Sequence, residues 1–162
     1  MKKTWQQKMA DKESMPKILK LERNFPCYNA VHAMGADEGD EIVLVNPSEI
    51  MPIMAAVPEG RLTTLSRICL RIARNHGVKG CCSLTTGIFI MTIANAVEEM
   101  KREGTSSAVP WWRTLKSDGS LNEKYPGGAA AQKDLLEKEG LTVLRKGKRF
   151  VVKDFGDFLV AD

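Results

Sequence analysis

The chain has 162 residues, of which 43% are hydrophobic and 27% are charged, and its formal net charge is +4. This length and apolar content are typical of one domain with a buried core, and they exclude a chain too short to form one. The longest apolar run, residues 87–94, is too short to span a membrane, and the charged N-terminus is unlike a secretory signal peptide. We therefore expect a cytoplasmic protein that does not contact a membrane.

Residues 1–45 are interpreted as an N-terminal extension, and residues 46–162 as the main domain. Within the extension, residues 4–12 are predicted to form a helix that ends before Pro16, because proline interrupts helical hydrogen bonding. Residues 41–45 are rich in β-branched side chains, which predicts a short strand. We assign no other element here and expect the extension to pack loosely on the domain.

Two helices are predicted at the start of the main domain. Asn46 followed by Pro47 is a helix start, which predicts a helix to residue 56. Thr63 or Thr64 caps the next helix, which is predicted to end at residues 76–77, a His-Gly pair.

The second of these helices has an apolar face and a basic face. Apolar residues recur with helical spacing at positions 65, 68, 69, 72 and 73. Arg67, Arg71 and Arg74 lie on the opposite side, and no acid pairs with them along the helix. Because unpaired like charges repel one another at this spacing, the pattern favours a surface that meets phosphate groups over one that is only soluble.

A third helix is predicted to begin at Ser83 or Thr85 and to end near residue 102, before Gly104. Its residues are apolar nearly all round, which indicates that the helix is buried. Residues 105–108 are predicted to form a loop.

The four cysteines, at positions 27, 69, 81 and 82, follow no disulfide framework, so reduced thiols are expected. Cys82 lies just before the predicted N-terminus of the third helix, where the helix dipole lowers the pKa of a thiol. A thiol enzyme centred on Cys82 is therefore one alternative function, although no histidine partner is evident. Adjacent cysteines do not easily place both sulfur atoms on one tetrahedral ion, so we predict no metal site and no cofactor.

Residues 109–140 are predicted to form a rigid turn, a short hairpin and an amphipathic helix. Two tryptophans follow Pro110, and the sequence Ser-Asp-Gly at 117–119 is typical of a turn. Gly127 and Gly128 allow the backbone to pass close to another group, and the leucines at 135–136 bury one side of the helix. The segment holds two large flat side chains and an arginine together, which indicates a binding site.

The C-terminal residues are predicted to form a strand pair, 141–144 and 148–152, around Lys146 and Gly147. Basic residues cluster at the tip of this hairpin, and a local positive cluster attracts phosphates whatever the global charge. The hairpin is typical of a wing, which either contacts the DNA backbone or only closes the core. Phe155 and Phe158 are predicted to pack residues 154–160 against it.

The sequence reads Pro-Trp-Trp-Arg at 110–113, Tyr-Pro-Gly-Gly at 125–128 and Leu-Leu-Glu-Lys-Glu-Gly at 135–140. At this spacing, the three motifs resemble the active-site loop and the following helix of the O-alkylguanine-DNA alkyltransferase (methylated-DNA–protein-cysteine methyltransferase) family. Residues 57–64 resemble the entry to the family's DNA-binding helices. The resemblance implies a mainly α fold with small β elements, namely an alkyltransferase C-terminal-like winged helix-turn-helix domain that here carries an N-terminal extension.

Trp111 stands where the family has the cysteine that accepts the alkyl group. The alkyltransferase-like branch also lacks this nucleophile, so the resemblance implies DNA binding and DNA repair without catalytic residues and without alkyl transfer. It also implies a base or lesion pocket in which Trp111 stacks on an extruded purine; the alternative is that buried tryptophans fill a vacant pocket. Pro126 replaces a serine that contacts the lesion in the enzymes. The predicted pocket residues are Trp111, Trp112, Arg113, Tyr125, Pro126, Gly127 and Glu139.

In the family, the helix at 83–102 is the recognition helix, and Leu84 takes the position of an arginine that replaces the flipped nucleotide in the base stack. A leucine can wedge between bases in the minor groove, whereas a core position for Leu84 is the alternative. The expected partners are double-stranded DNA and other repair proteins, and the expected state is a monomer. A plain winged-helix regulatory module that never flips bases is a further alternative function. The predicted DNA-binding residues are Thr63, Thr64, Arg67, Arg71, Arg74, Leu84, Lys146, Lys148 and Arg149.

Overall fold

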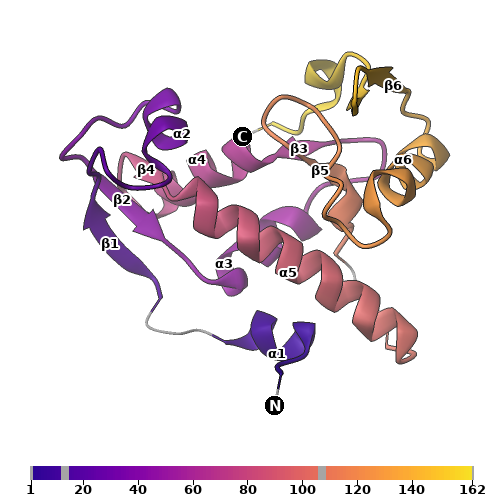
Figure 1. The fold of residues 1–162 in the computed structure, drawn as a ribbon, viewed down its shortest axis with the longest axis horizontal. Coiled ribbons are helices and arrows are strands. Elements are labelled where there is room, and N and C mark those ends of the chain that lie inside the picture. The colour runs from indigo at the N-terminus through magenta and orange to yellow at the C-terminus, as the bar shows by residue number, and fades with distance from the viewer. Residues whose placement is uncertain (1, 12–14, 106–108, 162) are drawn as a thin grey trace.

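The longest helix, α5 (Ser83–Arg102), crosses the molecule, and the remaining elements pack around it (Figure 1). The computed structural model describes residues 2–11, 15–105 and 109–161. Most of the predicted loop at 105–108, and residue 12 of the predicted N-terminal helix, lie outside the described residues. The described residues form six α-helices, two 3₁₀ helices and small two- and three-stranded sheets, so the prediction of a mainly α fold with small β elements is confirmed.

The helices predicted at the start of the main domain are confirmed. The first, α3 (Pro47–Ala55), is capped by Asn46, whose side chain accepts a hydrogen bond from the Ser48 N–H. The second, α4 (Leu65–His76), is capped by Thr64, whose hydroxyl accepts from the Arg67 N–H, and it ends at Gly77 in the left-handed conformation. Its predicted apolar face is buried against α3 and α5.

Helix α5 is buried on one side only, so the expectation of burial all round is wrong for its first two turns. Ile90, Ile93 and Val97 are in the core, whereas Leu84 and Ile88 are 50% and 55% exposed. The Leu84 and Ile88 side chains are one turn apart and therefore lie on the same face of α5. The alternative that Leu84 occupies the core is thereby contradicted.

The N-terminal extension contains more structure than predicted. Helix α1 (Trp5–Ala10) packs on α5, and strand β1 (Lys17–Lys20) leads to α2 (Tyr28–Ala33) and β2 (Glu41–Leu44). Strand β2 pairs antiparallel with β1 and parallel with β4 (Gly80–Cys81), which precedes α5. The sheet therefore crosses the predicted boundary between residues 45 and 46, which itself stays a prediction.

A buried apolar cluster holds the extension in place, in contrast to the loose packing expected. Leu21, Val31 and Ile42 are fully buried, and Cys27 packs with Cys82 from the start of α5. At Gly80, a Cβ atom would lie only 2.9 Å from the Val31 side chain, so the close approach of α2 to the sheet requires glycine at this position.

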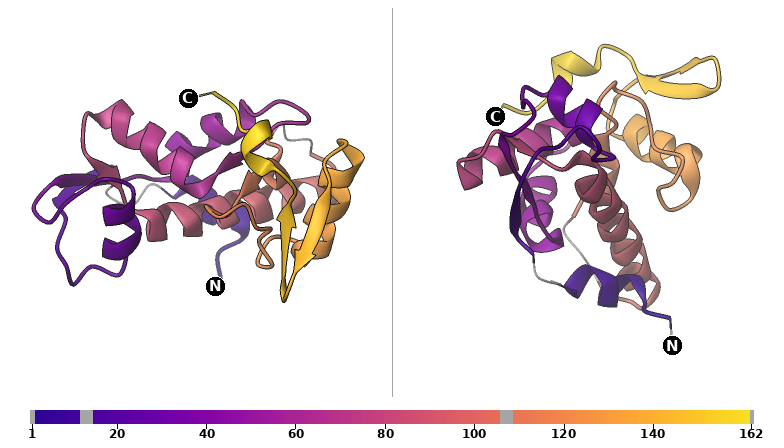
Figure 2. Two further views of the ribbon diagram at one scale, coloured as in Figure 1. Left: turned by 90° about the horizontal axis from the view of Figure 1, so that it is seen from above. Right: turned by 60° about the vertical axis from the view of Figure 1, so that its left-hand side comes forward.

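The C-terminal part contains the predicted helix α6 (Gly128–Lys138) and the predicted hairpin of β6 (Val143–Lys146) and β7 (Arg149–Val152). The short hairpin expected within residues 109–140 is absent from the described residues. The 3₁₀ helix η1 (Trp111–Arg113) instead leads to β5 (Thr114–Leu115), which pairs in parallel with β3 (Thr63–Thr64) just before α4. Figure 2 shows the C-terminal hairpin projecting from one end of the molecule, far from α2.

The 3₁₀ helix η2 (Phe155–Phe158) packs Phe155 and Phe158 on a cluster that includes Leu62 and, from the hairpin, Val143 and Val152, as predicted. No described helix is both long enough and apolar enough to cross a membrane.

Candidate nucleic-acid interface

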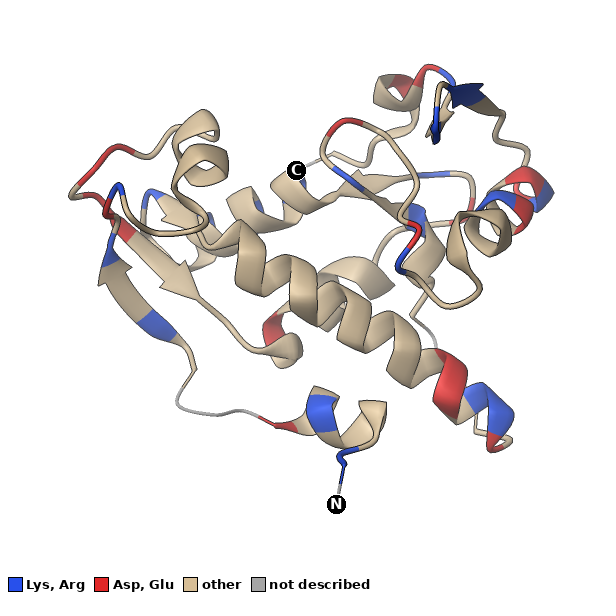
Figure 3. Cartoon of the chain, viewed as in Figure 1, with Lys and Arg blue, Asp and Glu red and all other residues tan. Residues whose placement is uncertain are grey.

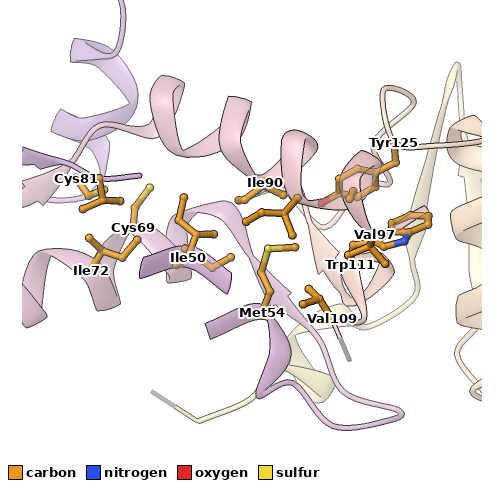
Figure 4. Packing of buried hydrophobic residues seen from close by; sticks show 14 of the residues in the cluster. Ile50, Met54, Cys69, Ile72, Cys81, Ile90, Val97, Val109, Trp111 and Tyr125 are labelled. Carbon is orange, nitrogen blue, oxygen red and sulfur yellow. The ribbon is translucent and has the colours of Figure 1, made fainter. Parts of the chain in front are cut away.

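Trp111 is packed into the core that α3, α4 and α5 share. Only 1% of the residue is exposed, and its ring contacts Trp112 and Tyr125 edge-on, with centroids 5.7 and 5.2 Å away. Its indole Nε1–H donates to Glu98 Oε1 on α5 at 3.1 Å, so its one polar atom is also satisfied. Figure 4 shows Trp111 and Tyr125 together at one end of the apolar core.

The prediction that Trp111 stacks on an extruded purine is therefore contradicted. Stacking requires an open ring face, and both faces of this indole are enclosed by protein. The alternative reading, in which buried tryptophans fill the pocket, describes this part of the structure.

Glu139 joins the neighbouring residues of the same loop into one network. Its carboxylate accepts from the Trp112 indole N–H at 2.6 Å, from the Gly60 backbone N–H at 2.9 Å, and from the Arg113 guanidinium at 2.9–3.0 Å. Arg113 also donates to the Val57 carbonyl oxygen at 2.8 Å. Arg113 and Trp112 are therefore both held by protein groups.

Burial by itself would raise the pKa of the Glu139 carboxyl. The hydrogen bonds from Arg113, from the Gly60 N–H and from the Trp112 indole outweigh that effect and hold the pKa below its usual value. Glu139 is therefore an anion with three different donors around it, and this arrangement joins η1, the end of α6 and the turn before β3.

The other predicted pocket residues also have structural contacts. Tyr125 is buried, and its hydroxyl donates to the Thr114 carbonyl oxygen at 2.9 Å. Burial raises the pKa of this hydroxyl, so it stays protonated. Gly127 has a positive φ of 78° and lies so close to Ala131 that a Cβ would meet its methyl group at 2.6 Å. Pro126 is partly exposed beside them.

What remains of a cavity next to Tyr125 is small. A space of about 40 Å³ is lined by residues of α4, α5 and the segment that follows η1, among them Leu65, Gly87, Thr114 and Tyr125. A water molecule needs about 10–15 Å³ of such space, so this cavity has room for only a few waters and is too small for a nucleobase.

A groove of about 670 Å³ adjoins that small space and shares Leu65, Gly87, Lys116 and Asn122 with it. The exposed side chains of Leu84 and Ile88 line this groove, and Ile88 was missed by sequence reasoning. The amphipathic signal that would have found it is hidden, because apolar residues occupy both the buried and the exposed face of α5.

The predicted arginine surface on α4 lies elsewhere. Arg67 and Arg71 line a different cavity of about 390 Å³ between α3, α4 and the C-terminal residues, and Arg67 donates to the Val160 carbonyl oxygen at 3.3 Å. Arg74 is exposed on the same helix. Thr63 and Thr64 are buried, with Thr64 acting as the helix cap, so neither hydroxyl is on the surface.

The structure places the predicted basic hairpin at the surface. Lys146 and Lys148 are exposed on either side of the turn at Gly147, and Arg149 pairs with Asp118 of the segment between β5 and α6. In Figure 3, β6 and β7 carry blue basic residues, whereas most of α5 is tan, which marks uncharged residues. The hairpin therefore offers positive charge, and α5 offers apolar surface.

Cys82 has no base beside it among the described residues. Its sulfur lies 3.4 Å from the Thr85 hydroxyl, and the residue is 6% exposed. His76 is engaged by Glu49, with Nε2 2.6 Å from Oε1. In the described part of the chain, no three His, Cys, Asp or Glu side chains are grouped so as to hold a metal ion.

Residues 47–141 match the family model described as 6-O-methylguanine DNA methyltransferase, DNA binding domain. No curated protein matches the chain. The fold is similar to that of S. pombe ATL in complex with DNA, with 20% identity, 71% of this chain and 94% of that chain covered, and a TM-score of 0.52. A structure of S. pombe Atl1 in complex with damaged DNA containing O6-carboxymethylguanine has the same identity and coverage and a TM-score of 0.48. The expected alkyltransferase-like helix-turn-helix fold is thus confirmed.

Proposed function

The chain belongs to the family of 6-O-methylguanine DNA methyltransferase DNA-binding domains, and on that basis we propose that it binds double-stranded DNA without transferring an alkyl group. The exposed pair Leu84 and Ile88 on α5 carries this proposal. Neighbouring apolar side chains that are exposed on one face of a helix provide a surface suited to contact with a partner.

Alkyl transfer requires a thiolate in an open pocket, and neither is present at the loop position. Trp111 has no nucleophilic atom, and its indole is enclosed. The nearby Glu139 carboxylate is occupied by hydrogen bonds from Arg113, Trp112 and Gly60. The loop has become part of the hydrophobic core, and its polar atoms serve the fold.

The DNA contacts are divided between two surfaces. Leu84 and Ile88 present an apolar edge that can enter the minor groove and separate stacked bases, as apolar wedges do in other minor-groove proteins. Lys146 and Lys148 at the tip of the β6–β7 hairpin provide positive charge for the phosphate backbone. Because the two surfaces are on different elements, the hairpin can contact the phosphate backbone while α5 contacts the groove of the same duplex.

The fold neighbour in S. pombe supports DNA binding by this fold, because its structure was determined in complex with DNA. It aligns over 71% of this chain, and the family match includes all of α5. The description of the matched family also names 6-O-methylguanine, which makes an O6-alkylated guanine the first damaged base to test.

The test is a titration of end-labelled duplexes that contain either guanine or O6-methylguanine at one position, followed by fluorescence anisotropy. We expect both duplexes to bind with an affinity that falls steeply as salt increases, and the modified duplex to bind more tightly. Equal affinities would leave a plain winged-helix module, and no binding to either duplex would overturn the proposal.

A second measurement addresses catalysis. Incubation with a duplex that carries a radiolabelled methyl group on guanine should leave the label on the DNA. Label on the protein would overturn the non-catalytic part of the proposal. In that case, Cys27→Ser and Cys82→Ser would identify the acceptor, because these two residues lie at the groove or next to it.

A further inference from the structure

The basic face of α4 is not part of the two surfaces assigned to DNA. Arg67 and Arg71 line the cavity of about 390 Å³ between α3, α4 and the C-terminal residues. Among the described residues, none lines both this cavity and the groove beside α5, and the residues of the hairpin do not line the cavity either. A helix face with three arginines therefore lies beside a cavity that the proposed function does not use.

We propose that this cavity binds a segment of a partner protein in which acidic side chains lie next to a large apolar side chain. The arginines of α4 bind the carboxylates, and the apolar wall opposite them contacts the apolar side chain. This inference is independent of the proposed DNA binding and adds a second surface for a partner. The volume lies in the range of about 300–1,000 Å³ that is usual for ligand pockets.

The polar side of the cavity is a single stripe of α4. Arg67, Arg71 and Asn75 are spaced four residues apart and therefore lie on the same face of the helix. Arg71 and Asn75 are exposed, and Arg67 is partly buried. A guanidinium can bind a carboxylate through two parallel N–H···O bonds, and arginine clusters are a recurring means of binding acidic segments.

Positive charge exceeds negative charge along this stripe. Glu49 is the acid among the described lining residues, and its Oε1 lies 2.6 Å from Nε2 of His76. Arg71 forms no ion pair with another described residue. Arg74 is exposed on the same helix but does not line the cavity, so the basic surface continues past it.

The length of this surface favours an extended ligand over a single small anion. From Arg67 to Arg74 the helix rises by roughly 10 Å, at about 1.5 Å per residue. A segment with two acidic side chains can therefore contact arginines both inside the cavity and beyond it.

The wall opposite the arginines is apolar. It is formed by Pro52, Ile53, Ala56 and Val57, from α3 and the residues directly after it. A phosphate group gains nothing from contact with this wall, whereas an apolar side chain is stabilised there by its removal from water. The combination of arginines with an apolar wall therefore favours a protein segment over the backbone of DNA.

The third wall comes from the C-terminal residues and is fixed by hydrogen bonds. The Leu62 N–H donates to the Phe158 carbonyl oxygen, and the Leu62 carbonyl oxygen accepts from the Val160 N–H, both at 2.9 Å. Arg67 donates to the Val160 carbonyl oxygen at 3.3 Å. Val160 and Ala161 line the cavity, although the family match ends at residue 141. The cavity is therefore formed partly by residues outside the matched domain.

The first test is a selection from a phage-displayed library of random peptides. The wild-type protein is the target, and Arg71→Glu is the counter-target. We expect the enriched sequences to combine two acidic residues with a large apolar residue between them or next to them. The inference is wrong if no such sequence is enriched, or if Arg71→Glu retains the same sequences.

The second test measures the affinity of a fluorescein-labelled peptide of the enriched sequence by anisotropy. We expect Arg71→Ala to bind this peptide at least about tenfold more weakly than the wild-type protein. The matched control is Arg102→Ala, which removes an exposed arginine from the last turn of α5 and should leave the affinity unchanged. Replacement of the acids of the peptide by their amides, or of its apolar residue by alanine, should also weaken binding.

A further pair of variants tests the cavity without a change of charge. Ala56 lines the cavity, whereas Ala55, one residue earlier, does not, and both are exposed. Ala56→Trp fills the cavity and should weaken peptide binding at least about tenfold, whereas Ala55→Trp should not. Circular dichroism verifies that each variant is folded.

The outcomes separate this inference from the proposed function. If Ala56→Trp binds the peptide as well as Ala55→Trp does, the cavity is not the site. If duplex DNA displaces the peptide and Ala56→Trp weakens duplex binding to the same extent, the cavity belongs to the DNA surface and the inference is overturned. If hexanoate binds in a manner that depends on Arg71 and no peptide does, the ligand is a small carboxylic acid, and the inference is again overturned. A wild-type protein that binds the peptide but no duplex would contradict the proposed function and leave the inference standing.

Discussion

The loop of η1 and the first two turns of α5 differ in what they have retained of a binding site. In the loop, the indole N–H groups of Trp111 and Trp112 and the guanidinium of Arg113 all have partners within the protein. On α5, Leu84 and Ile88 extend into solvent. A side chain whose ring faces and polar atoms are all engaged contributes to stability, and an exposed apolar one is available to a partner.

This difference shows that the segment with the family's sequence motif and the segment with the functional surface need not be the same. The loop motif is typical of the family, yet in this chain it supports the core, while the proposed binding surface lies on a helix with no charge in its first 15 residues. The predictions below test the two regions in opposite directions, with stability as the measurement for the loop and DNA affinity as the measurement for α5 and the hairpin.

The largest expected effect is that of Trp111→Ala on stability. Removal of a fully buried indole leaves a cavity and deprives Glu98 of its hydrogen bond, and the expected loss is about 4 kcal/mol in the free energy of unfolding. Urea denaturation followed by circular dichroism measures it. Trp5→Ala on α1, where the ring is only partly buried, is the control and should cost much less. If Trp111→Ala weakens DNA binding without loss of stability, the assignment of the two regions is reversed.

The next effect is that of Glu139→Gln, which removes the charge that pairs with Arg113. We expect a loss of about 3 kcal/mol in the free energy of unfolding, because the guanidinium is then left largely buried without its counter-ion. Glu137→Gln, at an exposed position in the last turn of α6, provides the matched control. A similar small effect for both variants would show that the Glu139 network does not hold the loop in place.

The Glu139 network also predicts a dependence of stability on pH. Because the pKa of Glu139 is lower in the folded protein than in the unfolded chain, its ionised form adds stability above the unfolded pKa of about 4.3. This contribution is lost as the pH falls through the folded pKa. The difference in unfolding free energy between the wild-type protein and Glu139→Gln should therefore be full at neutral pH and shrink in acid. A difference that stays constant with pH would contradict the assigned charge state.

The elements that the sequence predicts well are those fixed by local interactions. The ends of α4 follow from the Thr64 hydroxyl, which accepts from the Arg67 N–H three residues on, and from Gly77 in the left-handed conformation. The hairpin of β6 and β7 likewise closes around its own turn at Gly147. Each signal lies within a few residues of the element it defines, so one sequence contains it.

The parts that could not be predicted depend on contacts between distant segments. Strand β2, which pairs with β1, is placed by its pairing with β4, where Ile42 lies opposite Gly80, 38 residues away in the sequence. Trp111 is enclosed because Glu98 and Tyr125 reach it from other elements, which no local pattern indicates. The groove beside α5 likewise requires α2, and nothing in the sequence places α2 there.

On α5, the expected effect is on DNA affinity rather than on stability. Leu84→Glu and Ile88→Glu place a carboxylate where a phosphate or base edge is proposed to lie, and we expect each variant to bind duplex DNA at least about tenfold more weakly. Both side chains are exposed, so the free energy of unfolding should change by no more than about 0.5 kcal/mol.

The matched controls for these variants are on β1, in the N-terminal extension. Leu19→Glu and Ile18→Glu introduce the same charge at exposed leucine and isoleucine positions, and neither residue lines the groove. Equal losses of affinity in the two sets would mean that added negative charge acts at a distance, and the proposed role of α5 would then be wrong.

The smallest expected effect belongs to the hairpin, where the contact with DNA is through charge alone. Lys146→Ala and Lys148→Ala should each reduce the magnitude of the negative slope of log affinity against log salt by about 0.9, because one phosphate contact is lost. The preference between the two duplexes should be unchanged. Lys20→Ala on β1 removes the same charge at the opposite end of the molecule and should leave the slope as it is (Figure 1). A change in the slope with Lys20→Ala but not with the hairpin variants would place the phosphate contacts on the N-terminal sheet, and the division between an apolar helix and a basic hairpin would then be wrong.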